Sequence, residues 1–420
     1  MYAFEKVGSE PNPHALAALV KASEACAIVA SRDIVDVRGV KLWAQGKPVS
    51  AALHQRLIDR RLRNPLEVCL MAEDGVTPFS LRDDLKELIE SGHPIAGVVR
   101  PWATVLLTQM QHLPLHPVVQ LMFTASVAVR PATLRHAVAA MALAGAMVAR
   151  RDGSVQEVRL AMLGGLLHDI GEVYIHPQYL DYHQVLDLTG HKHLVVHPRV
   201  GQMLLSTLTD YPPALARAVG EHHERLDRSG YPARLGGDDL SPLGRVLAVA
   251  EVVLGIGRWP DAPLTRASFA LRVVPGEFDT DCAGFVWDAA RAAAEAPAPA
   301  VPSLDLYQQL AGIDRQLEQA RLLGQELRDQ GRDGAVIGVV QQALDRLDRL
   351  RIAWNALGLW RAGVGHTNDA ERFELQLAHA ELRERLRSVQ RECLLVSERL
   401  GETEKLRLEP LWQGLADARD

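Results

Sequence analysis

The chain carries the stretch Leu166-Leu167-His168-Asp169-Ile170-Gly171, which sets an imidazole and a carboxylate side by side within an apolar run. Eight of the sixteen histidines lie between His168 and His223, so imidazole groups are concentrated around this stretch. Imidazole and carboxylate groups are common protein ligands of transition-metal ions. The concentration therefore predicts a metal site in the middle of the chain.

Two further motifs follow the first one. Residues 197–201 read His197-Pro198-Arg199-Val200-Gly201, and residues 221–232 read Glu221-His222-His223-Glu224-Arg225-Leu226-Asp227-Arg228-Ser229-Gly230-Tyr231-Pro232. Outside the motifs, His136 lies 32 residues before the first motif's histidine, and Glu251 lies 29 residues after His222. Chance alone gives roughly one His-Asp pair in a chain of this composition. The arrangement of the motifs is therefore more informative than the pair itself.

The residue types favour a site for two ions. Neighbouring residues on a helix point about 100° apart, so each adjacent pair reaches one centre only where surrounding helices converge, as in a helical bundle. The motifs and the two residues outside them offer five imidazoles and two carboxylates. These belong to His136, His168, Asp169, His197, His222, His223 and Glu251. These are too many donors for one ion, and a bridging Asp169 would hold two ions roughly 3.5 to 4 Å apart. Mixed nitrogen and oxygen ligands without thiolate favour iron or manganese, with zinc and nickel as alternatives.

These motifs and spacings resemble the HD-GYP family of metal-dependent phosphodiesterases over about residues 118–294. The resemblance implies an HD-type helical bundle, iron or manganese as the metal, and Asp169 and His168 as catalytic residues. It also implies that one ion is held mainly by His136, His168, Asp169 and Glu251. The other ion would be held by Asp169, His197, His222 and His223. The remaining histidines of the cluster, at 176, 183, 191 and 193, do not fall on ligand positions.

The chain departs from the family's pattern near this site. Glu172 stands where the family has a lysine suited to substrate phosphate, Arg228 where it has a glycine, and Glu251 where it has an aspartate. We expect the Glu172 carboxylate to oppose phosphate binding. Ala132 replaces the glutamate that family members with a third ion carry, which favours two ions. The side chains expected to contact the substrate are Glu172, Arg225, Arg228 and Tyr231.

Composition and charge set the class of protein. The chain is 48% hydrophobic and 23% charged, as in a soluble protein with a full core. Its net charge of −6 argues against binding to nucleic acid or to anionic membranes, which needs a basic excess. The four cysteines are far apart and form no CxxC pair, which is typical of reduced thiols. With no secretory signal and no run long enough to span a bilayer, we expect a cytoplasmic protein.

Three regions are expected along the chain. Residues 1–115 predict a small α+β module, with an extended segment and turn at 37–48, a helix at 51–62, a strand at 65–71 and a further helix that opens at Ser80. Residues 118–294 are expected to form the HD-GYP-like phosphohydrolase domain. The proline-rich run at 296–302 ends this domain, because repeated proline favours an extended spacer.

The third region, residues 303–420, predicts a coiled-coil-like helical bundle. Apolar residues recur there at intervals of four and three, from Leu306 to Leu327 and from Leu382 to Leu400. A middle helix at 336–360, with turns at 331–334 and 363–368, would complete an antiparallel arrangement of three helices. Such stripes pack either within one chain or between two chains, so a homodimer through these helices is the alternative to an intramolecular bundle.

The expected fold is mainly α, and the leading expectation is a hydrolase for signalling nucleotides. It would cleave a cyclic dinucleotide, with cyclic di-GMP as the expected substrate, by metal-activated water. One alternative is a degenerate HD-GYP-like signalling module that binds a nucleotide or protein partner without turnover, for which Glu172 and Glu251 argue. Another is hydrolysis of a different nucleotide, because two metal ions do not themselves select guanine. The resemblance to the HD-GYP family further implies cyclase domains as protein partners, through Gly230-Tyr231-Pro232, and other signalling proteins are expected as well.

Overall fold

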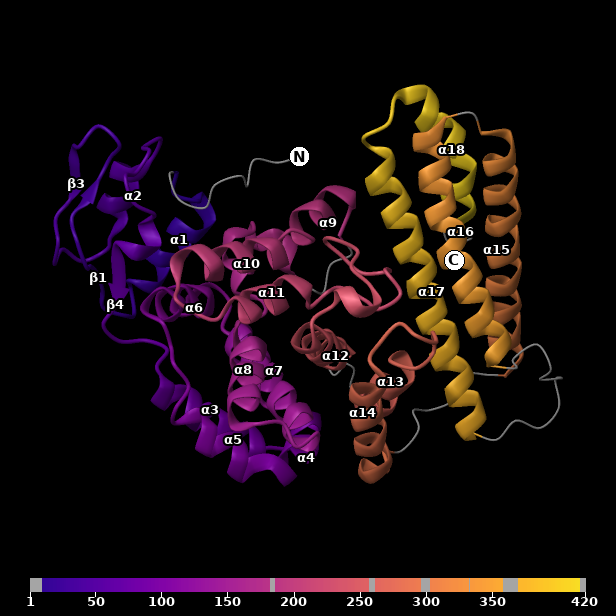
Figure 1. Ribbon diagram of the computed structural model, residues 1–420, viewed down its shortest axis with the longest axis horizontal. Coiled ribbons are helices and arrows are strands. Elements are labelled where there is room, and N and C mark those ends of the chain that lie inside the picture. Colours follow the sequence, from indigo (N-terminus) through magenta and orange to yellow (C-terminus); the bar gives the residue numbers. More distant parts are fainter. Residues whose placement is uncertain are drawn as a thin grey trace. The chain divides into compact units, whose positions relative to one another are not determined.

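The computed structural model is mainly helical, which confirms the expected fold class (Figure 1). It describes residues 10–181, 186–256, 261–295, 303–331, 333–357 and 369–415. His183, the proline-rich run at 296–302 and the turn at 363–368 lie outside the described residues. The chain divides into two compact units, Met1–Gly255 and Ile256–Asp420. The expected division into three domains stays a prediction.

The first part of the chain contains the short strands of the structure. The elements are α1 (Pro13–Ala22), β1 (Ile28–Ala30), β2 (Ile34–Val35), β3 (Lys41–Trp43), α2 (Ala51–Leu57), η1 (Leu66–Val68) and β4 (Leu70–Ala72). Strand β1 pairs with β4 and β2 pairs with β3, both antiparallel. The expected extended segment is therefore part of the β2–β3 hairpin, whose turn Asp36 closes by accepting the backbone N–H groups of Arg38 and Val40.

Several expected boundaries in this region were wrong by a few residues. Helix α2 ends at Leu57 and not at Leu62, because Asp59 has a φ of 58°, which a right-handed helix does not accommodate. The strand expected from residue 65 begins only at Leu70, after a turn of 3₁₀ helix. The helix expected to open at Ser80 begins at Pro78, because Thr77 and Ser80 form a capping box at its start.

Helices build the rest of the first unit. They are α3 (Pro78–Glu90), α4 (Pro94–Val99), η2 (Arg100–Trp102), α5 (Ala103–Met110), α6 (Pro117–Val129), α7 (Ala132–Arg150), α8 (Val155–Leu167), η3 (Ile170–Tyr174), η4 (Pro177–Leu180), α9 (Leu188–Leu194), α10 (His197–Leu208), α11 (Pro213–Glu221), η5 (Gly237–Asp239) and α12 (Pro242–Ile256). Helices α7 and α8 lie against each other (Figure 1). A Cβ atom at Gly165 of α8 would lie only 2.4 Å from the Ala140 carbonyl oxygen of α7, so the missing side chain sets how closely they approach.

Helix α7 is the core helix of this unit. Within the described residues it is the one helix that is long and apolar enough, by length and composition, to cross a membrane. However, 72% of its apolar window is buried inside the protein. Its apolar character is therefore accounted for by packing against neighbouring helices.

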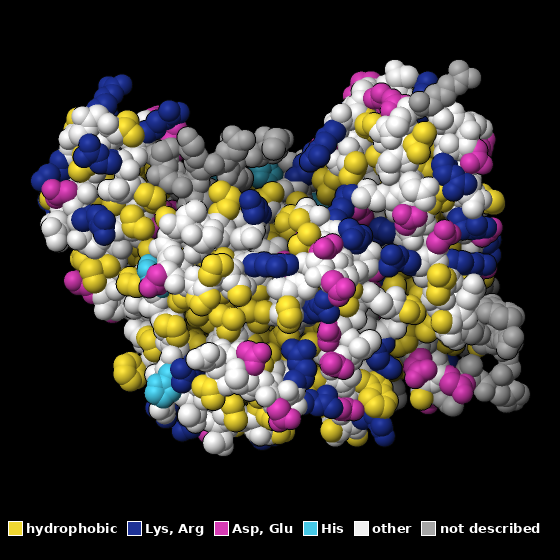
Figure 2. Space-filling model, in the orientation of Figure 1, with side chains coloured by type: hydrophobic (Ala, Val, Ile, Leu, Met, Phe, Trp, Pro, Cys, Tyr) yellow, Lys and Arg dark blue, Asp and Glu magenta, His cyan; other side chains and the backbone are white. Residues whose placement is uncertain are grey.

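The second unit contains α13 (Pro263–Ala270), α14 (Thr280–Ala293), α15 (Ser303–Gln330), α16 (Gly334–Ala356), α17 (Asp369–Ser397) and α18 (Glu402–Leu415). Helices α15 to α18 pack against one another (Figure 1). Their apolar stripes share one hydrophobic core and are therefore buried within this chain. The expectation of three helices after residue 303 was wrong: the second stripe ends near Gly401, and α18 follows as a fourth helix. On the face that Figure 2 shows, charged side chains of both signs lie over these helices.

A buried arginine links α17 to the segment before α14. The guanidinium of Arg385 donates to Glu277 Oε2 at 3.0 and 2.9 Å, to Glu381 at 2.5 Å and to the Ala270 carbonyl at 2.9 Å. Burial alone would lower the pKa of Arg385, but the two carboxylates outweigh it and keep the guanidinium charged. The segment around Glu277 also contributes Val273 and Val274 to the core of the C-terminal helices.

We predict that Arg385→Met destabilises the protein by about 3 to 5 kcal/mol, because it leaves the Glu277 carboxylate buried without its partner. The control is Arg387→Met on the same helix, whose side chain is 43% exposed and lies 3.8 Å from Glu384. An exposed pair of that kind contributes at most about 1 kcal/mol. Urea unfolding of the full chain measures both variants. Equal midpoints for the two variants would contradict the assigned role of Arg385.

Candidate metal centre

Five segments of the first unit bring the seven predicted ligands together. His168 caps the C-terminus of α8 and Asp169 precedes η3. The other five lie in α7, at the start of α10, at and after the end of α11, and in α12: His136, His197, His222, His223 and Glu251. A Cβ atom at Gly171 would lie 2.2 Å from the His197 carbonyl oxygen, so the glycine after the His-Asp pair lets η3 pack directly on α10.

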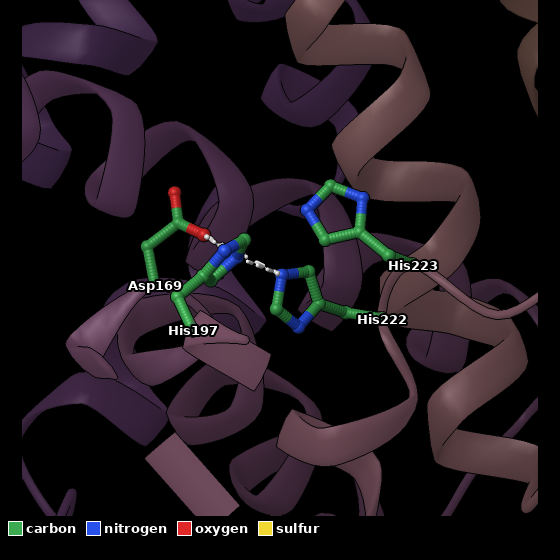
Figure 3. Close-up of side chains that lie close together, drawn as sticks. All are labelled: Asp169, His197, His222 and His223. Atoms are coloured by element: carbon green, nitrogen blue, oxygen red, sulfur yellow. Dashed lines mark hydrogen bonds and ion pairs between the residues drawn. The ribbon is translucent and has the colours of Figure 1, made fainter. Parts of the chain in front are cut away.

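The carboxylate of Asp169 lies between two pairs of histidines. Its Oδ2 lies 3.3 Å from His136 Nε2 and 3.2 Å from His168 Nε2. Its Oδ1 lies 3.4 Å from His197 Nε2 and 3.5 Å from His222 Nε2 (Figure 3). Each carboxylate oxygen therefore faces its own pair, which is the arrangement of a carboxylate that bridges two ions.

The backbone fixes the orientation of three of these imidazoles. Each ring has its Nδ1 close to the carbonyl oxygen three residues earlier: His168 to Gly165 at 2.8 Å, His197 to Leu194 at 2.7 Å, and His222 to Val219 at 2.7 Å. Because a carbonyl only accepts, Nδ1 must carry the proton. In the neutral ring Nε2 then presents its lone pair to the centre, as a metal ligand must.

The facing nitrogens leave room for a positive charge between them. His136 Nε2 and His168 Nε2 are 3.0 Å apart, and His197 Nε2 and His222 Nε2 are 3.1 Å apart. Two lone pairs at this distance repel each other unless a proton or a metal ion lies between them. A site that holds these pairs close together is therefore built for cations.

Burial and the neighbouring charged groups shift the pKa values of the side chains in this centre. Burial lowers the pKa of His136, but the Asp169 and Glu251 carboxylates outweigh it and raise that pKa to about 9. Burial raises the pKa of Glu251, but His136 and His168 hold it well below its usual range. By contrast, burial and its neighbouring histidines lower the pKa of His222 to about 4.

Glu251 provides the clearest indication that metal ions fit here. Its Oε2 lies 3.4 Å from His136 Nε2 and 3.3 Å from His168 Nε2. This atom is buried and has no hydrogen-bond partner among the residues that the structure describes. A buried acceptor of that kind is costly unless something else satisfies it. The donor atoms fall into two groups, His136, His168, Asp169 and Glu251, and Asp169, His197, His222 and His223, and within each group they lie within 4.8 Å of one another.

The four side chains expected to contact substrate differ in where the structure places them. Glu172 is buried at 3% exposure, and its Oε2 accepts from Arg130 Nη1 at 2.6 Å, so its charge is paired. Arg225 donates to the backbone carbonyls of Glu224 and His222. The other two are Arg228, which has a φ of 68° and contacts Asp239, and Tyr231, which stacks on His223.

Sequence reasoning missed two kinds of residue. Arg130, the partner of Glu172, is 42 residues away from it along the chain, and no local pattern joins the two. Glu221 and Glu224 flank the adjacent histidines and are both buried, at 3% and 0% exposure. The signal for these two residues was their position beside the histidines in the motif of residues 221–232. Charged side chains are rarely fully buried unless they have a partner.

Sequence comparisons with known proteins cover the region that contains this centre. Residues 122–254 match the HD domain family. This chain is 34% identical over 87 residues to 3′3′-cGAMP-specific phosphodiesterase 3 of Vibrio cholerae, covering 21% of this chain and 19% of that protein. It is 32% identical over 120 residues to a cyclic di-GMP phosphodiesterase of Pseudomonas aeruginosa, covering 29% of each. The cyclic di-GMP phosphodiesterase response regulator RpfG of Xanthomonas campestris is 34% identical over 111 residues, covering 26% of this chain and 29% of RpfG.

Residues 122–254 are therefore similar to the HD domain family, and this region contains all seven predicted ligands. The resemblance of this region to the HD-GYP family is confirmed. The chain spans less than a third of the length of each of the relatives named above.

We predict that the purified protein holds two transition-metal ions per chain and that Asp169→Ala loses most of both, because one carboxylate faces both histidine groups. Elemental analysis after anaerobic purification with iron or manganese supplied measures the content. The matched control is His176→Ala, because His176 belongs to the same histidine-rich stretch but lies outside both donor groups. An Asp169→Ala protein with two ions would show that the carboxylate does not bridge.

Proposed function

We propose that this chain is a metal-dependent phosphodiesterase that hydrolyses a cyclic dinucleotide, with cyclic di-GMP as the expected substrate. The observation that carries the proposal is the placement of the two Asp169 oxygens against two separate pairs of histidines. The names of the relatives support the substrate class, since they are phosphodiesterases for cyclic di-GMP or 3′3′-cGAMP.

The side chains of this centre have distinct tasks in the proposed reaction. Two divalent ions, which we expect to be iron or manganese, would supply an activated water and neutralise the charge that develops on the phosphodiester oxygens. Asp169 ties the two histidine groups together, and His168 extends from the same turn with its Nδ1 proton held by Gly165. The backbone carbonyls behind His197 and His222 keep those rings oriented before substrate arrives.

The ion pair between Glu172 and Arg130 affects the alternative function, a signalling module that binds a nucleotide or protein partner without hydrolysis. That alternative rested partly on a carboxylate placed where the family has a cation. The Arg130 guanidinium lies 2.6 Å from that carboxylate, so the pair as a whole carries no net charge. Repulsion of substrate phosphate by Glu172 is therefore smaller than an isolated carboxylate would cause.

The proposal predicts turnover of cyclic di-GMP by protein loaded with manganese or ferrous iron, measured by chromatography of the products. Parallel reactions with 3′3′-cGAMP and with a linear dinucleotide establish the substrate class. Asp169→Asn, which keeps the shape but removes the charge, should abolish hydrolysis. Two bound ions without hydrolysis of any of these compounds would instead favour the module that binds without turnover.

A second prediction concerns the charge at position 172. Glu172→Lys sets an ammonium against the Arg130 guanidinium in a mostly buried position, and we expect it to destabilise the protein by about 3 kcal/mol. It should lower hydrolysis and not raise it. The double exchange Arg130→Glu with Glu172→Lys restores opposite charges and should recover most of the lost stability. Urea unfolding and initial rates are measured on both variants. Faster hydrolysis by Glu172→Lys alone would show that Glu172 acts on substrate phosphate.

The remaining expectations go beyond the site and stay predictions. They are a cytoplasmic location, contact with cyclase or other signalling proteins, self-association through the C-terminal helices, and the absence of nucleic-acid and membrane partners. The burial of the C-terminal apolar stripes within the chain favours the intramolecular bundle over a dimer built from the same stripes.

A further inference from the structure

The loop that follows the adjacent histidines folds back onto the second of them. The backbone N–H of Tyr231 donates to the His223 carbonyl at 3.1 Å. The Tyr231 ring stacks on the His223 imidazole, with ring centroids 4.5 Å apart and planes inclined by 17°. Gly230 permits this approach, because a Cβ atom there would lie 2.4 Å from Glu224 Cα. An aromatic ring is thus held flat against a predicted metal ligand.

The side chain of Glu224 holds this loop in place. Glu224 is fully buried, and its carboxylate accepts three consecutive backbone N–H groups. Oε1 accepts from Ala233 at 2.6 Å and from Arg234 at 3.0 Å, and Oε2 accepts from Leu235 at 3.0 Å. Charge-assisted bonds of this kind are about twice as strong as neutral ones. The carboxylate beside His223 therefore anchors the segment that begins two residues after Tyr231.

The ring of His223 is oriented differently from its neighbours. His168, His197 and His222 each have Nδ1 held by the carbonyl three residues earlier. Among the residues that the structure describes, the His223 ring packs against three other rings: it is stacked on Tyr231, tilted against His222 and edge-on to His197. The flat face that restrains rotation of this ring is supplied by Tyr231.

We infer that Glu224 is a positioning residue that keeps Tyr231 flat against His223, and that Tyr231 thereby orients a ligand of the metal centre. Glu224 acts through residues 233–235 and belongs to neither donor group of the centre. This inference rests on the metal centre of the proposed function and not on the substrate or on turnover. It gives Tyr231 a task that the sequence-based expectation of substrate contact did not include.

The first test uses the metal-free full-length protein, labelled with ¹³C in its histidine rings. The stacked Tyr231 ring should shift the Cε1–H signal of His223 upfield, and His223→Gln identifies that signal. Glu224→Ala and Tyr231→Ala should both remove the shift, whereas Tyr231→Phe, which keeps the ring, should retain it. An unchanged shift in Glu224→Ala would overturn the inference.

The second test measures metal affinity by titration with Mn²⁺. Removing a residue that orients a ligand typically lowers metal affinity by about 10- to 100-fold. We expect Glu224→Ala and Tyr231→Ala each to lower the affinity for one of the two ions by about tenfold. The double variant should be no weaker than either single one, because both act through the same stack. Full affinity in both single variants would overturn the inference.

Glu221→Ala is the matched control. Glu221 is also a buried carboxylate in this motif, but it accepts from the backbone N–H and the hydroxyl of Ser241, at 2.9 and 2.5 Å, and not from residues 233–235. It should keep the His223 signal in place. If it removed the shift as Glu224→Ala does, a specific role for Glu224 would be rejected. Should Glu224→Ala fail to fold, Glu224→Gln, which keeps volume and one acceptor oxygen, should lose part of the shift. A protein that passes both tests yet hydrolyses nothing supports this inference and contradicts the proposed function.

Discussion

The centre of this protein depends on one buried carboxylate that faces four imidazoles. Asp169 lies within 3.2 to 3.5 Å of four Nε2 atoms, which come from three helices and from the turn that Asp169 itself occupies. A buried carboxylate is costly unless cations or donors surround it. The helices that carry these histidines must therefore converge on one point. Gly171 contributes to this convergence, because its missing side chain lets η3 pack directly on α10.

Much of the site could be predicted because its motifs are local. His168-Asp169 and His222-His223 are adjacent in sequence, and family-like spacing was enough to add His136, His197 and Glu251. The structure brings all seven together in two overlapping groups. The fold class was predictable for a similar reason, since apolar periodicity is itself a local property.

The rest depends on contacts that sequence does not display. The partner of Glu172 is Arg130, 42 residues earlier, and only the folded chain reveals it. Element ends were misplaced where one residue's backbone conformation decides the outcome, as at Asp59. The fourth C-terminal helix was missed because the apolar stripe continues to Leu400, past the end of α17 at Ser397, and so hides the break before α18.

Gly165 connects the packing of two helices to the width of the metal centre. Its missing side chain lets α8 lie against the Ala140 carbonyl of α7, and its own carbonyl orients the His168 ring. His136 on α7 and His168 at the end of α8 belong to the same donor group. The distance between these two histidines therefore depends on the contact between the two helix backbones. A larger residue at position 165 would increase this distance, although residue 165 is not itself a predicted ligand. The separation of two predicted ligands therefore depends on how closely two helices pack.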